Sequence, residues 1–176
     1  MSSPVADRLV LDASAVIAID QSEPAAASIR TILAEHLAAG GEIDVPDHFW
    51  LEFVNVLVRR YSRTPTEAVE AIRELDELGI VTFEIDRPLL LLVLRSMLTG
   101  ELSAYDAAYL ALVEVVDGRL LTLDSRLAAA AGDRAIPGPW QRPRRSAEAP
   151  APYAPLAGPA FGPYLAELRR RAEAIA

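Results

Sequence analysis

The sequence predicts an α/β fold of three layers, in which a central parallel sheet is covered by helices on both faces. Short apolar segments typical of strands alternate along the chain with longer segments that have helical periodicity. Capping residues and glycines separate these segments. Of the 176 residues, 52% are hydrophobic and 24% are charged. This composition indicates a globular protein and excludes a disordered one.

The first third of the chain carries two strand patterns and three helix patterns. The expected elements, in order, are a strand at 8–11, helices over 14–20 and 24–39, a short strand at 43–45 and a helix over 48–62. Gly40 and Gly41 end the second helix, because glycine readily adopts the left-handed conformation that follows a helix. Asp47 is expected to cap the third helix.

The rest of the globular part continues this alternation. The expected elements are a helix over 65–78, a strand at 80–85 that is the clearest of the four, a helix that Asp86 caps and that runs to about Thr99, a helix from Ser103 to Asp117, a strand at 119–123 and a short helix over 125–131. Thr64, Pro65 and Glu67 stand in the order of a cap, a first-turn proline and the acid of a capping box. Gly79 and Gly118 end the helices that precede the last two strands.

Charge and proline content divide the chain near residue 140. Residues 1–140 contain 11 Arg and 22 acidic residues, whereas residues 141–176 contain six Arg and three acidic residues. Eight of the thirteen prolines lie between Pro137 and Pro163, where they favour an extended chain over a helix. Residues 164–176 have the pattern of a short helix. We therefore expect an acidic domain over 1–140, followed over 141–176 by a proline-rich tether and a basic C-terminal helix.

Two residue types are missing from the whole chain. It has no Cys and no Lys, since all 17 basic residues are Arg. These absences exclude thiolate zinc sites, cysteine nucleophiles, P-loop lysines and Schiff-base chemistry. With only His36 and His48, an imidazole-rich metal site is not expected either. Chemistry in this chain must therefore rely on carboxylates, hydroxyls and Arg.

No segment has the pattern of an export signal or a membrane span. The N-terminus lacks the apolar core of a signal peptide. The longest apolar run, Leu89 to Leu94, is far shorter than the roughly 20 residues of a transmembrane helix. We expect a cytoplasmic protein with no membrane partner.

Four acidic residues lie at strand ends or within otherwise apolar helices. Asp12 and Asp124 follow the first and last strands, where the sites of parallel α/β sheets form. Glu52 interrupts the apolar helix segment FWLEFVNVLV, and Asp106 lies near the start of the helix that begins at Ser103. These four acids are the candidate catalytic residues.

Each of the four acids also has a purely structural interpretation. Asp12 and Asp124 can cap the helices that follow them, and Asp106 can form a capping box with Ser103. Glu52 can pair with an Arg, because an isolated acid among apolar residues is unfavourable. These alternatives stay open for each residue taken alone.

Taken together, four carboxylates at one end of a sheet would repel one another and raise one another's pKa values unless a cation shared the site. Oxygen ligands without Cys or His favour Mg²⁺ or Mn²⁺ over zinc. Such ions bind phosphate oxygens and activate water for attack on phosphorus. We therefore expect hydrolysis of phosphodiester bonds.

The four acids and their surroundings resemble the PIN domain, and more narrowly the VapC-type ribonuclease toxins of bacterial toxin–antitoxin pairs. The segments that carry the resemblance are LVLDASAVIA, HFWLEFVNVL, LSAYDAAYLAL and LLTLDSRL, which contain Asp12, Glu52, Asp106 and Asp124. It covers residues 8–135. It implies a PIN-like fold. It also implies that these four residues form a Mg²⁺-dependent site that cleaves RNA, with Asp12 and Asp106 as the most direct metal ligands. It also implies the toxin of a type II toxin–antitoxin system, a homodimer and a cognate antitoxin as partner.

Further residues are candidates for supporting roles. The resemblance implies that the hydroxyls of Ser14 and Thr122 orient ligands or water. Asn55, one helical turn from Glu52, either does the same or is an ordinary surface residue. Three arginines later on the same helix either contact RNA phosphates or only favour the C-terminal end of the helix, and these are Arg59, Arg60 and Arg63.

The resemblance does not extend to residues 141–176, and three interpretations of this tail stay open. It can bind RNA through its arginines, which are Arg142, Arg144, Arg145 and Arg169–Arg171. It can instead lie over the domain as an antitoxin would and direct Arg at the carboxylates. Finally, it can be a solvated appendage or an oligomerisation helix.

Two other functions compete with that of a nuclease toxin. One is a phosphate-handling enzyme or receiver with Asp12 as phosphoacceptor, but position 14 is Ser rather than a second acid, and the chain lacks the lysine that such sites need. The other is a PIN-like RNA-binding module, or a nuclease inhibited by its own tail. The presence of all four acids argues against a degenerate site.

Overall fold

The structure is a computed structural model, and it describes residues 7–138. The predicted tether and C-terminal helix lie outside the described residues, so the division of the chain near residue 140 stays a prediction.

Four parallel strands form one sheet in the order β3-β2-β1-β4. The strands are β1 (Arg8–Leu11), β2 (Glu42–Pro46), β3 (Val81–Phe83) and β4 (Arg119–Leu121). In the central strand, Val10 pairs with Asp44 of β2 on one side and with Leu120 of β4 on the other. Helices connect each strand to the next, as parallel pairing requires. The predicted α/β class with a parallel sheet is confirmed.

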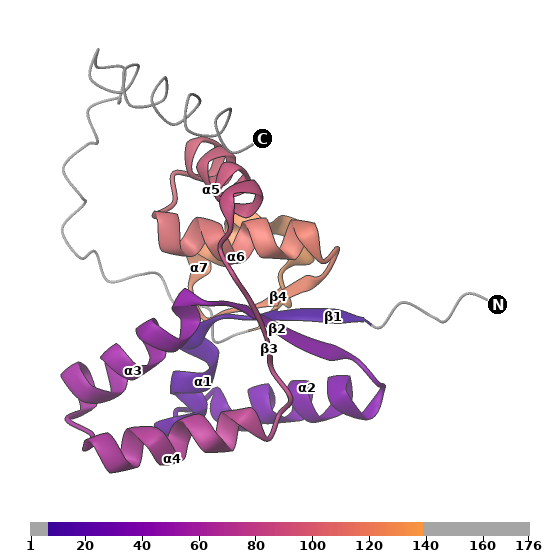
Figure 1. Ribbon diagram of the computed structural model, residues 1–176. Coiled ribbons are helices and arrows are strands. Elements are labelled where there is room, and N and C mark those ends of the chain that lie inside the picture. Colours follow the sequence, from indigo (N-terminus) through magenta and orange to yellow (C-terminus); the bar gives the residue numbers. More distant parts are fainter. Residues whose placement is uncertain (1–6, 139–176) are drawn as a thin grey trace, which may run out of the picture. The chain divides into compact units, whose positions relative to one another are not determined.

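Helices cover both faces of the sheet, which confirms the layered architecture among the described residues. They are α1 (Ala13–Asp20), α2 (Ala26–Ala38), α3 (His48–Tyr61), α4 (Pro65–Asp76), α5 (Arg87–Gly100), α6 (Ala104–Val115) and α7 (Ser125–Ala131), followed by a 3₁₀ turn at Gly132–Arg134. In Figure 1, α1 to α4 lie on one side of the sheet, and α5, α6 and α7 lie on the other. Among the described residues, no helix combines the length and the apolar character that crossing a bilayer requires.

The hydrophobic core lies on both faces of β1. Leu9, Val10 and Leu11 are buried one after another, as expected of a central strand with helices on each side. Phe49 and Phe53 of α3 pack with parallel rings in the core, with a centroid separation of 6.3 Å. These contacts fix the first turns of α3 close to the end of the sheet where β1 stops.

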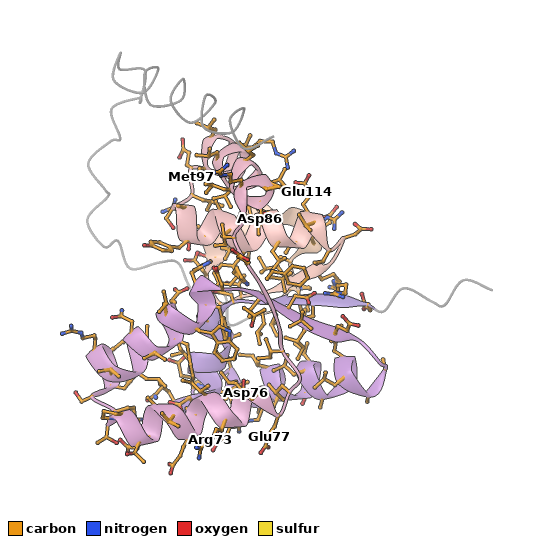
Figure 2. The ribbon with its side chains drawn as sticks, in the orientation of Figure 1. Arg73, Asp76, Glu77, Asp86, Met97 and Glu114 are labelled. Atoms are coloured by element: carbon orange, nitrogen blue, oxygen red, sulfur yellow. The ribbon has the colours of Figure 1, made fainter. Side chains whose placement is uncertain are left out.

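Two of the predicted caps form, and one does not. The capping box between Thr64 and Glu67 is complete at the start of α4. Asp86 accepts a hydrogen bond of 2.9 Å from the Leu89 amide at the start of α5 (Figure 2). The prediction that Asp47 caps α3 is wrong, because its carboxylate instead accepts a 3.4 Å bond from the Ile85 amide.

The strand expected at 80–85 is shorter than predicted and lies at the sheet edge. Its partner β2 ends at Pro46, which pairs with Phe83, and the next residue already leads into α3. Beyond Phe83 the segment therefore has no strand beside it. The sequence pattern predicted β character correctly, but the length of a strand is also set by its neighbour.

The glycines behave differently at the ends of α4 and α6. Gly79 has a positive φ of 66°, as predicted for a helix terminator. After α6 the left-handed residue is Asp117, with φ of 50°. At position 118 a glycine is required because a Cβ there would lie only 2.7 Å from the Arg8 carbonyl oxygen.

Candidate active site

Asp12 lies at the carboxyl end of β1, next to the end of β4. Its amide donates a 3.1 Å hydrogen bond to the Leu121 carbonyl, which extends the pairing of the two strands by one residue. The side chain is buried. Asp12 occupies the N-cap position of α1, but its side chain makes no capping hydrogen bond. The hydrogen bonds that its carboxylate does make lead instead to two side-chain hydroxyls.

Two hydroxyl groups hold the Asp12 carboxylate. Ser14 Oγ and Thr122 Oγ1 both donate to Asp12 Oδ2, each at 2.5 Å. The same two hydroxyls accept bonds of 3.0 Å from the amides of Leu123 and Asp124. They therefore link the ends of β1 and β4 and fix the orientation of the carboxylate, in the positions that the sequence predicts for them.

The surroundings of Asp12 make its negative charge unfavourable. Burial raises the pKa of Asp12, and the hydrogen bonds from Ser14 and Thr122 oppose this shift. The nearby negative charge of Asp106 raises the pKa further. A carboxylate whose ionised form is disfavoured by burial and by a neighbouring carboxylate is stabilised when a cation binds beside it.

Asp106 lies in the first turn of α6, and its side chain is buried. Ser103 caps this helix, since its hydroxyl accepts a 3.1 Å bond from the Asp106 amide. This cap uses the backbone of Asp106, so it is compatible with a role for the carboxylate beside Asp12.

Glu52 comes from α3 and meets a buried tyrosine of α6. The Tyr109 hydroxyl donates a 3.1 Å hydrogen bond to Glu52 Oε2. Burial raises the pKa of Tyr109 well above its ordinary value, and the charges of Asp12 and Glu52 raise it further. The Tyr109 hydroxyl is therefore within the influence of both the Asp12 and the Glu52 charge. Tyr109 follows Asp106 by one turn of α6. The sequence pattern does not single out Tyr109, because a tyrosine in an apolar helix fits the pattern of a core residue.

Asp124 caps α7, as its structural alternative predicted. Its Oδ1 accepts bonds of 2.8 Å and 3.1 Å from the amides of Arg126 and Leu127. Its own amide donates to Thr122 Oγ1, the hydroxyl that holds Asp12. Asp124 is thus linked to Asp12 through the Thr122 hydroxyl and has a structural role at this end of the site.

The remaining candidates lie on α3 or, in the case of Arg63, just beyond its C-terminal end, although the sequence predicted all three arginines on one helix. Asn55 lines a cleft of about 560 Å³ together with Glu52 and Asp106. The three arginines do not line this cleft. Arg63 pairs with Asp20 at 3.3 Å and with Glu67 at 3.7 Å, and Arg60 lies over the Tyr61 ring at 5.4 Å. Arg59 is exposed near the C-terminal end of α3.

The oxygen-rich donor set fits a magnesium ion held by few protein ligands. Within residues 7–138, no three acidic or histidine side chains stand close enough to hold an ion by themselves. Mg²⁺ commonly binds through one or two carboxylates and completes its coordination with water and substrate phosphate. Asp12 and Asp106 can supply such a pair, and their mutual repulsion favours a bound cation.

The fold of this chain is similar to that of known proteins. The family model of the PIN domain matches residues 9–133. The crystal structure of PAE2754 from Pyrobaculum aerophilum is similar, with 26% identity, a TM-score of 0.52, and coverage of 74% of this chain and 83% of that chain. No curated protein matches the chain significantly.

Two further solved structures share the fold at lower identity. VapC20 of Mycobacterium tuberculosis, a toxin that cleaves the sarcin-ricin loop, is 15% identical, with a TM-score of 0.57 and coverage of 73% of this chain and 99% of that chain. A toxin–antitoxin complex from Klebsiella pneumoniae is also 15% identical, with a TM-score of 0.56 and coverage of 73% and 96%.

Proposed function

The chain belongs to the PIN-domain family, and from that premise we propose that it is a metal-dependent endoribonuclease whose site consists of the four carboxylates described above. The observation that carries the proposal is the buried pair of Asp12 and Asp106 beyond the carboxyl end of β1. A buried carboxylate that is close to a second one is stabilised when a cation binds beside them. The related structures of ribonuclease toxins support the choice of RNA as substrate.

Each side chain has a distinct task in this proposal. Asp12 and Asp106 would hold Mg²⁺ or Mn²⁺, with Glu52 and Asp124 completing the acidic site. Ser14 and Thr122 keep the Asp12 carboxylate in one orientation, and Tyr109 does the same for Glu52. A bound divalent ion supplies an activated water and stabilises the charge that develops on the phosphate.

Removal of the metal tests this function directly. We expect the purified chain to cleave single-stranded RNA with Mg²⁺ or Mn²⁺, to lose cleavage in EDTA, and to recover it when excess Mg²⁺ is added. Gel analysis of end-labelled RNA measures all three. The variant Asp106→Asn, purified in parallel, controls for contaminating ribonucleases, which would persist in it. Cleavage that continues in EDTA would contradict the proposal.

We further propose that the chain is the toxin of a toxin–antitoxin pair. The similarity to the complex from Klebsiella pneumoniae supports this assignment. We expect a small protein to co-purify with the chain at native expression, and RNA cleavage to be suppressed in that complex. Mass spectrometry of the co-purified material, followed by cleavage assays before and after separation, checks both points.

The proposed homodimer has a candidate interface on α5. This helix exposes an apolar stripe of Leu91, Leu94 and Leu98, and Leu98 is 87% exposed. Exposed apolar stripes of this kind mark interaction sites. Arg95, which lies within the stripe's span, pairs with Glu114 of its own chain (Figure 2 labels Glu114). A self-complementary apolar stripe suits a two-fold interface between identical chains.

We expect the double variant Leu94→Glu with Leu98→Glu to be monomeric, because it would place four carboxylates in the dimer interface. Light scattering after size-exclusion chromatography measures the mass. Val69→Glu, on the exposed face of α4, introduces the same kind of charge elsewhere and should leave the dimer intact. A wild-type chain that runs as a monomer would disprove the interface.

A further inference from the structure

The cleft beside Glu52 and Asp106 contains a buried histidine, His48, whose ring packs against those of Tyr105 and Tyr109. His48, in the first turn of α3, is only 8% exposed. Among the described residues, neither of its ring nitrogens has a hydrogen-bond partner. A buried polar group without a hydrogen-bond partner destabilises the folded protein, so its presence needs an explanation. Because His48 lines the cleft that holds two of the proposed catalytic acids, a ligand in that cleft is the natural partner.

The wall next to His48 is aromatic and apolar. The Tyr105 ring lies 5.6 Å from the His48 ring, and Tyr105 is 67% exposed. Leu51, on the same cleft, is exposed as well. Tyr105 directly precedes Asp106 in the sequence. An exposed ring at the edge of an acidic site offers a flat surface on which an aromatic group can stack.

The ligand that fits these features is flat, aromatic and has hydrogen-bonding groups at its edge. A neutral imidazole has one donor and one acceptor, which suits the edge of a base better than a phosphate. A free phosphate would also be repelled by Glu52 and Asp106. Aromatic side chains stack on the unpaired bases of single-stranded RNA in many proteins.

We propose that Tyr105 and His48 form a binding site for one unpaired base of the RNA substrate, with Tyr105 stacking on the base and His48 hydrogen-bonding to its edge. This inference rests on the proposed nuclease function, because the base belongs to the strand whose phosphate reaches Glu52 and Asp106. Tyr105 is not held in the core, so an entering base can displace it from His48 and then stack on it. The site selects where the strand is cut, since it positions one nucleotide beside the carboxylates.

Measuring RNA binding in a variant that does not cleave RNA separates the role of the base site from that of the catalytic acids. The full chain with Asp12→Asn serves as the parent, and the affinity for labelled single-stranded oligonucleotides is measured by fluorescence anisotropy. In that parent, Tyr105→Ala should weaken binding about 5- to 150-fold, the range expected for loss of one stacked base. Tyr105→Phe keeps the ring and should bind within about twofold of the parent.

A set of oligonucleotides with one abasic nucleotide at successive positions provides the matched control on the RNA. At one position, the missing base should weaken binding as much as Tyr105→Ala does, and the two changes together should cost no more than either alone. His48→Phe keeps a ring in place but removes both nitrogens. It should reduce the differences in affinity among oligonucleotides that differ only in the base at that position.

The outcomes separate this inference from the nuclease proposal. If the wild-type chain cleaves RNA but Tyr105→Ala binds as tightly as the parent at every position, the base site is wrong and the nuclease stands. If abasic and Tyr105→Ala effects add fully, Tyr105 does not contact a base, and the inference also falls. If the wild-type chain neither cleaves nor binds RNA, both proposals fail together.

Discussion

The substitution Asp12→Asn is expected to reduce RNA cleavage about a thousandfold while the protein stays folded. Asp12 is buried and its carboxylate is fixed by the hydroxyls of Ser14 and Thr122. Asn has nearly the same shape and can still accept these bonds, but it cannot supply a negative charge to a metal ion. Loss of about 4 kcal/mol of metal-dependent stabilisation of the transition state corresponds to this factor.

The stability of Asp12→Asn should not fall together with its activity. Burial and the charge of Asp106 both raise the pKa of Asp12, so its ionised form is unfavourable in the folded protein. Removing that charge should leave the melting temperature unchanged or slightly higher. Asp76→Asn on α4 (Figure 2) makes the same change at an exposed position and should retain full activity. Initial rates of cleavage and thermal unfolding curves of the three proteins measure the separation, and full activity of Asp12→Asn would refute the assigned site.

The sequence alone predicted much of this fold because its signals are local. The alternation of strands and helices, the capping box at Thr64 and the cap at Asp86 depend on residues within one helical turn. Strand lengths were predicted less well. The strand expected at 80–85 is limited to Val81–Phe83 by the point at which its neighbour ends, which is a property of the sheet and not of the segment.

Candidate site residues were found where an acid interrupts an apolar pattern or follows a strand. That rule selected Asp12, Glu52 and Asp106, which the structure brings to one end of the sheet around Tyr109. Their catalytic roles stay predictions. The rule could not select Tyr109, because a tyrosine in an apolar helix fits the pattern of a core residue. Its contact with Glu52 joins residues 57 positions apart, and only the packing of α3 against α6 reveals it.

Asp44 is an acid that the same rule should have selected and did not. It lies in the middle of β2 between Ile43 and Val45 and is completely buried. Its partner is Arg8 of the neighbouring strand, whose guanidinium binds both carboxylate oxygens, at 2.7 Å and 2.5 Å. The partner could not be identified before the order of the strands was known. This ion pair joins β1 to β2 and therefore contributes to the stability of the sheet. In the described part of the chain, it makes no contact with the proposed active site.

The substitution Arg8→Met is therefore expected to destabilise the protein by about 3–5 kcal/mol at neutral pH, because it leaves the buried charge of Asp44 without its partner. Arg8 also pairs with Glu42, and its guanidinium lies 5.7 Å from the centre of the Phe83 ring. Glu42 is exposed, so the loss of its ion pair with Arg8 changes the free energy of unfolding only a little. Urea unfolding followed by circular dichroism measures the change.

The pH dependence of this variant has a definite sign. In the wild type, burial raises the pKa of Asp44 above its ordinary value, and Arg8 opposes this shift. The folded state therefore holds its proton more tightly than the unfolded chain, so stability is lost as pH rises from about 4, the ordinary value, through the raised folded pKa. Without Arg8 the folded pKa rises further. The difference between Arg8→Met and wild type should therefore be largest at pH 7 and should shrink as the pH falls towards 4.

A double variant separates the loss of the ion pair from the loss of packing by the long Arg side chain. Combining Arg8→Met with Asp44→Val removes both charges and places a β-branched residue in a buried strand, where it packs well. Apolar replacement of a whole buried ion pair is often neutral or stabilising. We expect the double variant to recover most of the stability that Arg8→Met loses. Because it lacks Asp44, it should also lack the loss of stability above about pH 4 that Asp44 causes in wild type and, more strongly, in Arg8→Met. If the double variant is as unstable as Arg8→Met, the cost arises from packing of the Arg8 side chain over β2 and β3, and Asp44 is not the cause.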